Sequence, residues 1–392
     1  MPETKTLKIV HIVEGFTGGI ITYLCSVLPR LAERGFDVTL ICSLDRSSPR
    51  HSFCLQRLRE EGITTYVISM ERRISPLKDV KSLVGILKIL LKNKFDVVHT
   101  HCSKAGVLGR AAAFLAGSRA TVHSPHCFAF LRCEGHFRKQ FFLILEKILG
   151  IFTTKLIAVS SSEADIAVCN HIVPAARCVQ INNGLLNDEP RKHLSSPDRK
   201  FELDRLSGCK NTKQIVTTVC RLVEYKGVFR FLKAAELYRQ KNALFLVAGE
   251  GEIREQVQKY IYENNLSEKV KLLGYVTETS RLYAISDVLA VCSDAEAQSY
   301  VILEAMRSRC PVVATSVTGN RDIISHEKTG LLVEPEPESI AAGIDELLSD
   351  AKKRRRYAEN AYTYFCREHS VEKQVSSLAW VYRNCFEKDE ID

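Results

Sequence analysis

The chain has 392 residues, of which 45% are hydrophobic and 26% are charged, and its formal net charge is +9. This length exceeds one ordinary hydrophobic core and predicts two domains, and the composition is that of a soluble globular protein. No apolar run approaches the roughly 20 residues of a transmembrane helix, and the first residues lead into a strand without an apolar leader segment. We therefore expect a cytoplasmic protein, with peripheral contact at the cytoplasmic face of a membrane left open by the positive charge.

The charge and the cysteines exclude further classes. A net charge of +9 fits an enzyme that handles anionic substrates, whereas no basic-aromatic module for nucleic acid is visible. The 14 cysteines form no Cys-x-x-Cys pair and no zinc-ligand spacing. Most of them fall inside predicted strands or helices, so we expect reduced, buried thiols.

Short β-branched runs alternate with helical periods along the whole chain, which is typical of parallel sheets covered by helices. The first series of predicted strands covers residues 8–13, 37–42, 64–68, 96–99, 120–122, 156–159 and 179–181. The second series covers residues 215–219, 244–247, 271–273, 288–291, 312–315 and 330–333.

Between the two series the chain turns polar and charged, which predicts a linker at residues 191–213. We expect an α/β protein with two Rossmann-like, doubly wound domains facing a central cleft. The first domain covers residues 1–190 and is joined by an amphipathic C-terminal helix in residues 371–392. The second domain covers residues 214–370.

The first strand is followed by a turn with two adjacent glycines, Gly18 and Gly19. Adjacent glycines allow positive φ and a close approach of the backbone to a ligand, and the helix that follows offers its N-terminus to an anion. The spacing differs from the Gly-x-Gly-x-x-Gly fingerprint, so NAD binding is disfavoured. A bare Gly-Gly turn is also compatible with a purely structural role.

Two cations follow the first strand of the second series. Arg221 closes that strand and Lys226 comes five residues later, so both are expected at the carboxyl end of the sheet. There they would neutralise a diphosphate and stabilise it as a leaving group. The alternative is a pair of ordinary surface cations.

Two glutamates bracket the change from an apolar strand to an apolar helix near residue 300. Glu296 is expected in the loop after the strand and Glu304 about one turn inside the helix. Backbone N–H groups at the helix start lie at the positive end of the helix dipole and attract phosphate. These N–H groups belong to Gln298, Ser299, Tyr300 and Val301. The combination indicates a nucleotide-sugar site, although two unrelated surface glutamates would show the same spacing.

Histidines and cysteines gather in the first series, at His99, His101, Cys102, His123, His126 and Cys127. A metal site is conceivable because imidazole and thiolate suit zinc, but no ligand pair lies on a helix, so no metal is expected. His126 follows a strand end and is the best functional candidate. His99 and His123 are more simply structural.

Residues 137–149 and 79–94 are each predicted to form a basic, apolar helix. Such a helix can rest on a membrane surface. The sequence favours the plainer interpretation, a helix packed on the sheet.

Taken together, these features resemble the retaining glycosyltransferases of family 4, which have the two-domain GT-B fold. The resemblance covers nearly the whole chain. Its main motifs are Gly18-Gly19, Asp96-Val-Val-His-Thr-His101, Ser124-Pro-His126, Ile157-Ala-Val-Ser160, Asn183-Gly184, Arg221 with Lys226-Gly227, Ala248-Gly-Glu-Gly251, Glu296 to Met306 and Thr329-Gly-Leu-Leu332.

The resemblance implies a role for each site residue. Arg221 and Lys226 would grip the diphosphate, Glu304 the ribose hydroxyls and Glu296 the hydroxyls of the transferred sugar. Gly19 would bring its backbone to the phosphates, and His126 would contact the donor sugar near the reacting carbon. The catalytic set is thus His126, Glu296, Arg221 and Lys226. The donor-binding set adds Gly18, Gly19, Gln298, Ser299, Tyr300, Val301 and Glu304.

Members of this family work without a metal and retain the anomeric configuration, and no cofactor is expected besides the nucleotide-diphosphate sugar itself. The family commonly has Gly-Phe-Gly between the two glutamates, where this chain has Ala297-Gln298-Ser299. That departure bears on the choice of sugar rather than on transfer. The segment 96–130 most resembles the branch that builds bacterial surface polysaccharides on lipid-linked acceptors.

We therefore expect a retaining, metal-independent hexosyltransferase that moves a sugar from a nucleotide-diphosphate sugar to a glycan or lipid-linked acceptor in cell-envelope polysaccharide synthesis. Two alternatives share the architecture. One is a nucleotide-sugar 2-epimerase, for which Glu14 is the single acid/base candidate in the first domain. The other is a non-catalytic protein that binds sugar nucleotides.

Overall fold

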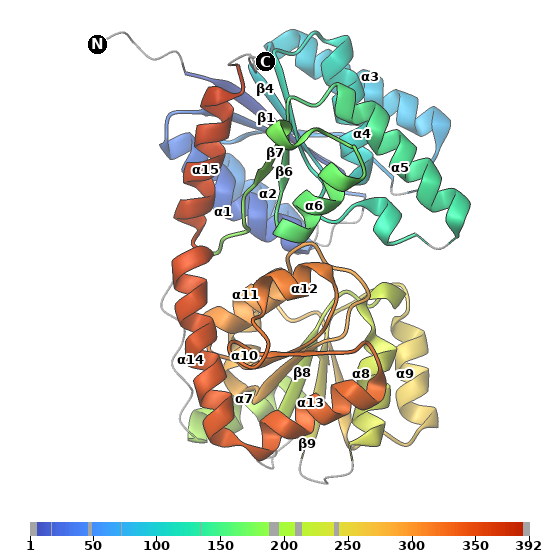
Figure 1. Cartoon of the computed structure of the whole chain (residues 1–392), viewed down its shortest axis with the longest axis vertical. Helices are drawn as coiled ribbons and strands as arrows, with labels where there is room; N and C mark the ends of the chain where they lie inside the picture. The colour runs from blue at the N-terminus through green and yellow to red at the C-terminus, as the bar shows by residue number, and fades with distance from the viewer. Residues whose placement is uncertain are drawn as a thin grey trace. The chain divides into compact units, whose positions relative to one another are not determined.

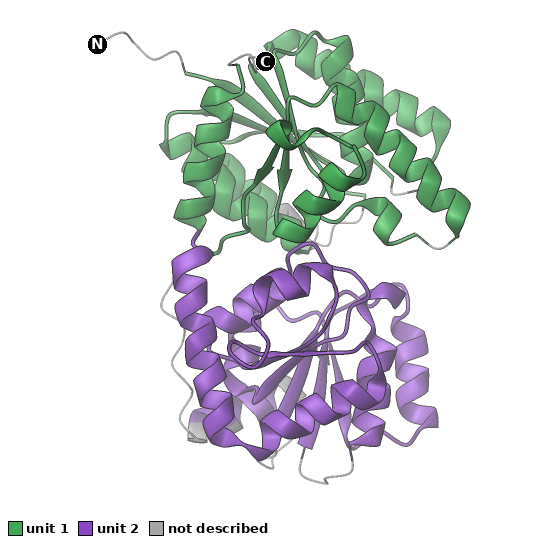
Figure 2. Ribbon diagram, in the orientation of Figure 1, with its two compact units in different colours: residues 1–185, 371–392 green, residues 186–370 purple. Residues whose placement is uncertain are grey.

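The computed structural model describes residues 6–16, 18–45, 49–71, 73–133, 135–187, 196–207, 214–238 and 243–386 of the chain. The chain divides into two compact units (Figure 2). Unit 1 comprises Met1–Leu185 and Val371–Asp392, and unit 2 comprises Leu186–Ser370. Each unit is a parallel sheet with helices packed on its faces (Figure 1), so the expected fold class of two Rossmann-like α/β domains is confirmed.

Unit 1 contains, in the described residues, a seven-stranded sheet in the order β3-β2-β1-β4-β5-β6-β7. Its strands are β1 (Lys8–Val13), β2 (Asp37–Cys42), β3 (Thr64–Val67), β4 (Val97–His101), β5 (Ala120–Ser124), β6 (Lys155–Ala158) and β7 (Cys178–Gln180). Its helices are α1 (Gly19–Glu33), α2 (Pro49–Glu60), α3 (Pro76–Asn93), α4 (Ser103–Leu115), η1 (Ala129–Leu131), α5 (His136–Ile151), α6 (Ser161–Cys169), η2 (Ala175–Arg177) and α15 (Val371–Asn384).

The alternation of side chains along β1 decides what each face of this sheet carries. Val10 and Ile12 face α3 and α4 and pack with Ile86 and Leu90 in one apolar cluster. His11, between them, faces the opposite side, where the central strands carry polar as well as apolar side chains.

Unit 2 contains a six-stranded sheet of described residues in the order β10-β9-β8-β11-β12-β13. Its strands are β8 (Gln214–Val219), β9 (Ala243–Ala248), β10 (Val270–Gly274), β11 (Val288–Val291), β12 (Val312–Thr315) and β13 (Leu331–Val333). Its helices are α7 (Ser196–Ser207), η3 (Glu224–Lys226), α8 (Val228–Leu237), α9 (Arg254–Glu263), α10 (Thr279–Ile285), α11 (Tyr300–Arg307), α12 (Thr318–Ile323), α13 (Pro337–Ser349) and α14 (Ala351–Glu368).

Every strand predicted from the β-branched runs is present, with ends that differ by at most two residues. The predicted linker at residues 191–213 contains a helix that was not predicted, α7, at residues 196–207. This helix has a polar sequence, yet it buries Leu203 completely against Ile215, Leu244 and Leu282. A single well-placed apolar side chain was too weak a periodic signal to predict a helix there.

The C-terminal helix α15 belongs to unit 1, although it follows α14 of unit 2 in the chain. It packs along α1 (Figure 1), and Arg34 Nη1 donates a hydrogen bond to Ser376 Oγ at 2.8 Å. Tyr382 on its inner face is completely buried. Among the helices of the described residues, none combines the length and the apolar character that a membrane crossing requires.

Candidate functional site

In each unit the strand order reverses at one place, between β1 and β4 in unit 1 and between β8 and β11 in unit 2. Ligands of doubly wound sheets bind beyond the carboxyl ends of the strands at such a switch point. Gly18 and Gly19 follow β1, His126 follows β5, Arg221 and Lys226 follow β8, and Glu296 follows β11. Each of these four loops thus follows a strand that borders a switch point or the strand next to it.

The loops after β8 and β11 are joined directly to each other in unit 2. The backbone N–H of Asp294 donates to the carbonyl of Tyr225 at 2.8 Å, and Arg230 Nη1 donates to the carbonyl of Cys292 at 2.8 Å. Gly227 has a φ of 68°, and a Cβ there would lie 1.9 Å from the carbonyl oxygen of Cys292. Only glycine fits this close approach, which sets Lys226 beside the β11 loop.

The result is an ion pair between Lys226 Nζ and Glu296 Oε1 at 2.6 Å, with side chains that are 22% and 11% exposed. Ser293 Oγ donates to the same Oε1 at 2.7 Å. Burial acts to lower the pKa of Lys226, but the Glu296 carboxylate outweighs it and holds the pKa above its ordinary value. Lys226 is therefore a fixed cation. Among the described residues Glu296 Oε2 has no hydrogen-bond partner.

Glu304 is held in the same manner on α11. Tyr283 OH donates to Glu304 Oε2 at 2.9 Å and Thr279 Oγ1 donates to the same atom at 3.2 Å. Burial raises the pKa of Glu304 above its ordinary value, and the hydrogen bond from Tyr283 acts against that rise. Within the described part of the chain Glu304 Oε1 has no hydrogen-bond partner. Tyr283 and Thr279 were not predicted, because their role depends on α10 lying beside α11.

The remaining candidates of unit 2 lie in the loops after β8 and β11 and at the start of α11. Gln298 and Ser299 are buried in the turn before α11, and Tyr300 and Val301 begin that helix with partly exposed side chains. Arg221 is partly exposed directly after β8. The first N–H groups of α11 have no partner within the helix, as helix geometry requires.

In unit 1 the glycine turn has a backbone that needs glycine. Gly18 is the N-cap of α1 with a φ of 59°, and Gly19 is the first helical residue. Glu14, in the same loop, accepts a hydrogen bond from the backbone N–H of Lys104 at the start of α4. This bond gives Glu14 a helix-capping role. Glu14 was the one acid/base candidate for an epimerase, and its position now has a structural explanation that does not favour that activity.

His126 lies in a loop with unusual backbone geometry. His126 and the next residue, Cys127, have φ values of 50° and 78°, a conformation that costs non-glycine residues about 1–3 kcal/mol each. Glu163 holds the loop, because its Oε1 accepts from the N–H of Cys127 at 2.7 Å and its Oε2 from the N–H of Val159 at 2.9 Å. Such local strain is a feature of ligand sites. Burial of most of the ring lowers the pKa of His126 to about 4.

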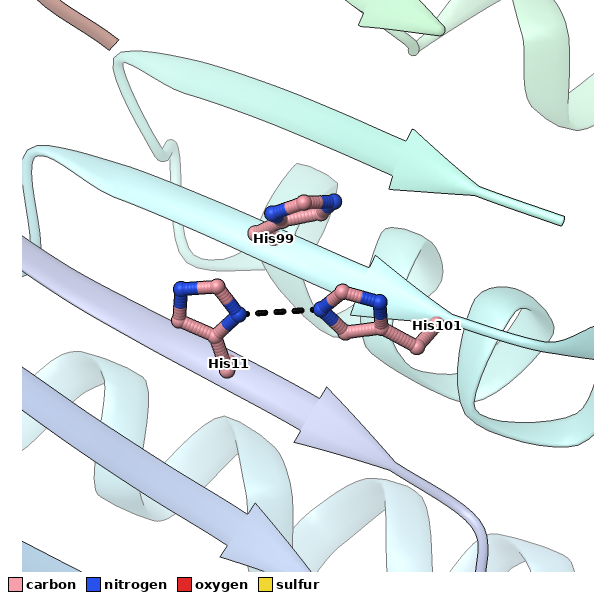
Figure 3. Close-up of side chains that lie close together, drawn as sticks. All are labelled: His11, His99 and His101. Carbon is pink, nitrogen blue, oxygen red and sulfur yellow. Dashed lines mark hydrogen bonds between the residues drawn. The ribbon is translucent and has the colours of Figure 1, made fainter. Parts of the chain in front are cut away.

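Next to His126 lies a cluster of buried histidines that the sequence predicted only in part. One ring nitrogen from each of His11, His99 and His101 lies within 4.8 Å of the other two (Figure 3). His11 Nδ1 is 2.9 Å from His101 Nε2, and His101 Nδ1 is 3.0 Å from His126 Nε2. His11 was missed because it lies in a different strand, and only the pairing of β1 with β4 places it opposite His99.

The structure thus brings the candidates together in two groups, each within one unit. Lys226, Glu296 and Glu304 with their supporting hydroxyls form the group in unit 2. The glycine turn and His126 with its histidine neighbours form the group in unit 1. Two carboxylates, each tied through one oxygen and open at the other, beside a fixed cation are suited to a polyhydroxylated, phosphorylated ligand.

Two family models match the chain. Residues 18–184 match the glycosyl transferase 4-like domain, and residues 200–364 match the glycosyl transferases group 1. An Escherichia coli protein named UDP-Gal:alpha-D-GlcNAc-diphosphoundecaprenol alpha-1,3-galactosyltransferase is 30% identical over 335 residues, 84% of each chain. CapM of Staphylococcus aureus, a capsular polysaccharide biosynthesis glycosyltransferase, is 23% identical over 381 residues, 96% of this chain and 95% of CapM.

Solved structures agree on the fold. Alr3699/HepE of Anabaena, crystallised with UDP and glucose, aligns with a TM-score of 0.82 at 21% identity, over 96% of this chain and 100% of that chain. The doubly wound units, the candidate residues at the switch point of each unit and these matches define a GT-B glycosyltransferase. The chain belongs to the family 4 type of these enzymes.

Proposed function

We propose that this glycosyltransferase is a retaining, metal-independent hexosyltransferase. It moves a sugar from a nucleotide-diphosphate sugar to a glycan or lipid-linked acceptor in the synthesis of a cell-envelope polysaccharide. The observation that carries this proposal is the pair of carboxylates Glu296 and Glu304, each anchored through one oxygen and open at the other, with the cation Lys226 fixed at 2.6 Å from the first.

The chemistry of a sugar nucleotide matches these groups. Arg221 and Lys226 neutralise the diphosphate, which leaves as the sugar transfers, and such preset charge is commonly the largest single contribution to catalysis. The open oxygen of Glu304 accepts from the ribose hydroxyls, and that of Glu296 accepts from hydroxyls of the sugar. In unit 1, the N–H of Gly19 approaches the phosphates and His126 contacts the sugar near its reacting carbon.

The two cations Arg221 and Lys226 take the part that a divalent metal plays elsewhere, which is why no metal is required in this proposal. In the transfer step the acceptor oxygen bonds to the anomeric carbon on the face from which the diphosphate departs. The bond from that carbon to the phosphate oxygen breaks, and the acceptor proton passes to the departing phosphate oxygen. No covalent sugar–enzyme intermediate forms, and the configuration is retained.

The relatives suggest which donor and acceptor to test first. The Escherichia coli relative is named for UDP-galactose and for an acceptor linked to diphosphoundecaprenol. HepE was crystallised with UDP and glucose. UDP-hexoses are therefore the first donors to test, and a sugar on a polyprenyl diphosphate is the first acceptor.

The test is a melting-temperature and hydrolysis screen of UDP-, GDP- and ADP-sugars with EDTA present. One nucleotide diphosphate should raise the melting temperature, because a ligand that binds the folded state stabilises it. The nucleotide sugar that contains this nucleotide should be hydrolysed slowly. NMR should show that an α-linked donor first releases the α-anomer of the free sugar. Release of the β-anomer would refute retention, and loss of turnover with EDTA would refute metal independence. If no nucleotide shifts the melting temperature, the phosphate-binding role of Lys226 is wrong.

The proposal includes peripheral membrane contact through helix α5. Its inner face packs Phe142 and Leu143 against the cluster around β6, as expected for a sheet-packed helix. Its outer face carries an apolar stripe at helical spacing, with side chains 50–90% exposed. The stripe consists of Phe137, Phe141, Ile144, Ile148 and Ile151.

The first turn of the same helix also carries two exposed basic side chains, Arg138 and Lys139. A helix that combines an exposed apolar stripe with exposed basic groups favours the interface of an anionic membrane. Sedimentation with vesicles should therefore show binding that rises with the fraction of phosphatidylglycerol and falls with salt. The double variant Phe137→Ser, Phe141→Ser should lose most of the binding. Phe53→Ser, which removes a side chain 67% exposed on α2, is the matched control, and equal loss in both proteins would contradict the role of α5.

A further inference from the structure

A continuous series of hydrogen-bonded groups runs through the interior of unit 1 and ends at His126. Ser124 Oγ lies 2.9 Å from His99 Nε2, and His99 Nδ1 lies 2.6 Å from the hydroxyl of Tyr382. That hydroxyl lies 3.4 Å from His11 Nε2, the longest contact of the series. His11 Nδ1 is 2.9 Å from His101 Nε2, and His101 Nδ1 is 3.0 Å from His126 Nε2.

The parallel pairing of β1 with β4 creates this series. His11 is the register partner of His99, and Val13 is the partner of His101. Side chains two residues apart in a strand share a face, so the three imidazoles project together toward α15. Helix α15 then packs Tyr382 against both His11 and His99, whose rings lie 6.1 Å and 5.7 Å from the tyrosine ring.

These imidazoles are better suited to hydrogen bonding with one another than to holding a metal ion. Both ring nitrogens of His11, His99 and His101 already have partners, so coordination would break bonds that are made. All three side chains are completely buried, and three neutral imidazoles supply no negative charge to offset a buried dication.

The imidazoles of the series are neutral at pH 7. Burial lowers the pKa of His11 to about 3, and burial together with the neighbouring histidines lowers the pKa of His99 and His101 well below the ordinary value. A neutral imidazole has one N–H donor and one acceptor nitrogen. The protons along the series must therefore all point in one direction or all in the other.

The buried end of the series decides between the two directions. Within the described residues, His99 is the one hydrogen-bond partner of Ser124 Oγ, and Ser124 is 2% exposed. If the protons pointed toward Ser124, its own hydroxyl proton would be buried without an acceptor, which costs about 1–3 kcal/mol. If Ser124 donates instead, every buried proton is used and His126 Nε2 becomes an acceptor.

We propose that Tyr382 is a positioning residue that acts through His11 and His101 to hold His126 as its Nδ1–H tautomer. His126 is partly exposed, and its Nδ1 has no hydrogen-bond partner in the described residues. This nitrogen then presents a donor to an oxygen of the bound donor sugar or its diphosphate. The substrate part rests on the proposed function, whereas the tautomer part does not.

The tautomer can be measured without turnover. Long-range proton–nitrogen correlation NMR on the full-length protein with ring-labelled histidine distinguishes Nδ1–H from Nε2–H, and the His126→Ala variant assigns the His126 signals. Wild-type His126 should be the Nδ1–H form. Tyr382→Phe removes the hydroxyl but keeps the ring, so the direction of the protons is no longer imposed and His126 should shift toward Nε2–H.

Tyr23→Phe is the matched control. The Tyr23 ring packs 5.1 Å from that of His101 and 5.5 Å from that of His126, but in the described structure its buried hydroxyl has no hydrogen-bond partner. The tautomer should be unchanged in this variant. An Nε2–H form in the wild type, or the same tautomer in wild type and Tyr382→Phe, would overturn the proposal, as would signals that move on removal of metal by EDTA.

Turnover separates this inference from the proposed function. Tyr382→Phe should lower kcat about twofold to tenfold with little change in donor KM, the effect of one hydrogen bond that matters in the transition state. If His126→Ala keeps wild-type kcat, the role of His126 toward the sugar is wrong while the NMR result stands. If His126→Ala loses activity and Tyr382→Phe changes neither kcat nor the tautomer, the positioning role of Tyr382 is wrong.

Discussion

At the scale of single residues, the site in unit 2 depends on hydrogen-bond partners that hold one oxygen of each carboxylate and leave the other oxygen open. Glu296 and Glu304 each accept two hydrogen bonds through one oxygen. A carboxylate held in this way keeps its direction, and its second oxygen remains available to a ligand hydroxyl. Removing either of these groups, or the cation beside Glu296, should therefore affect turnover more than folding.

We predict that Lys226→Ala and Glu304→Ala each remove most of the activity while the protein stays folded. Loss of a charged hydrogen-bond partner costs roughly 1.5–3 kcal/mol, or on the order of tenfold to a hundredfold in rate. Donor turnover and circular dichroism are the measurements. Lys259→Ala and Glu263→Ala, which remove an exposed pair on α9, are the controls, and wild-type rates in either site variant would refute the assignment.

A second prediction concerns Gly227, whose missing Cβ lets the loops after β8 and β11 touch. Gly227→Ala should destabilise the protein by more than the about 1–3 kcal/mol of a left-handed alanine, because the added carbon would lie 1.9 Å from the carbonyl of Cys292. Gly35→Ala is the control, since Gly35 has a φ of 84° with nothing within 4 Å of a Cβ. Urea denaturation of both variants separates the contact from the backbone strain. Equal losses would show that the loops can move apart without cost.

At the scale of elements, helix α7 shows how a polar segment becomes ordered through a buried leucine. Leu203 is 0% exposed and joins the cluster formed by β8, β9 and α10. Arg281 of α10 also forms an ion pair with Glu202 of α7 at 2.6 Å. The helix therefore belongs to the folded core of unit 2, despite a composition typical of a linker.

We predict that Leu203→Ala costs about 2–5 kcal/mol of unfolding free energy, the usual range for a buried leucine truncated to alanine. Phe201→Ala on the same helix removes a side chain that is 68% exposed and should cost little. Because both residues lie on α7, a comparison of the two variants by urea denaturation isolates the effect of side-chain burial. A similar small effect in both variants would mean that α7 contributes nothing to the core.

At the scale of the whole molecule, the buried histidines make the stability of unit 1 depend on pH. Burial lowers the pKa of His11 to about 3 and of His126 to about 4, below the unfolded value of about 6.5. The unfolded chain thus binds more protons than the folded one between pH 6.5 and 4, so stability rises with pH in that window. It is fully present above pH 6.5 and declines as the pH falls toward 4.

We predict that the urea midpoint of unit 1 falls steeply between pH 7 and pH 5, with up to about 1.4 kcal/mol per pH unit from each buried histidine. Trp380, the single tryptophan of the sequence, lies on α15 of unit 1, so its fluorescence reports this unit. A midpoint that stays constant from pH 7 to pH 5 would mean that these imidazoles are hydrated in the folded protein.

The sequence by itself determined the fold class, the strands and the loops that carry Lys226, Glu296 and Glu304. Strand alternation, helical periodicity and glycine placement are local properties, and a candidate site after a parallel strand follows from the direction of the strand. The sequence also placed His126 among the functional candidates, from its position just after a strand.

The tertiary structure decided what these residues touch. The supports of Glu304 come from α10, the partner of His99 in β1 is His11, and the hydroxyl that joins the two comes from Tyr382 in the last helix. Tyr382 lies 283 residues from His99 along the chain. Contacts of this kind depend on strand order and helix packing, and no local pattern of residues encodes them. The ordering of α7 was likewise decided by tertiary packing, because the core of unit 2 supplies the apolar surface that its own sequence lacks.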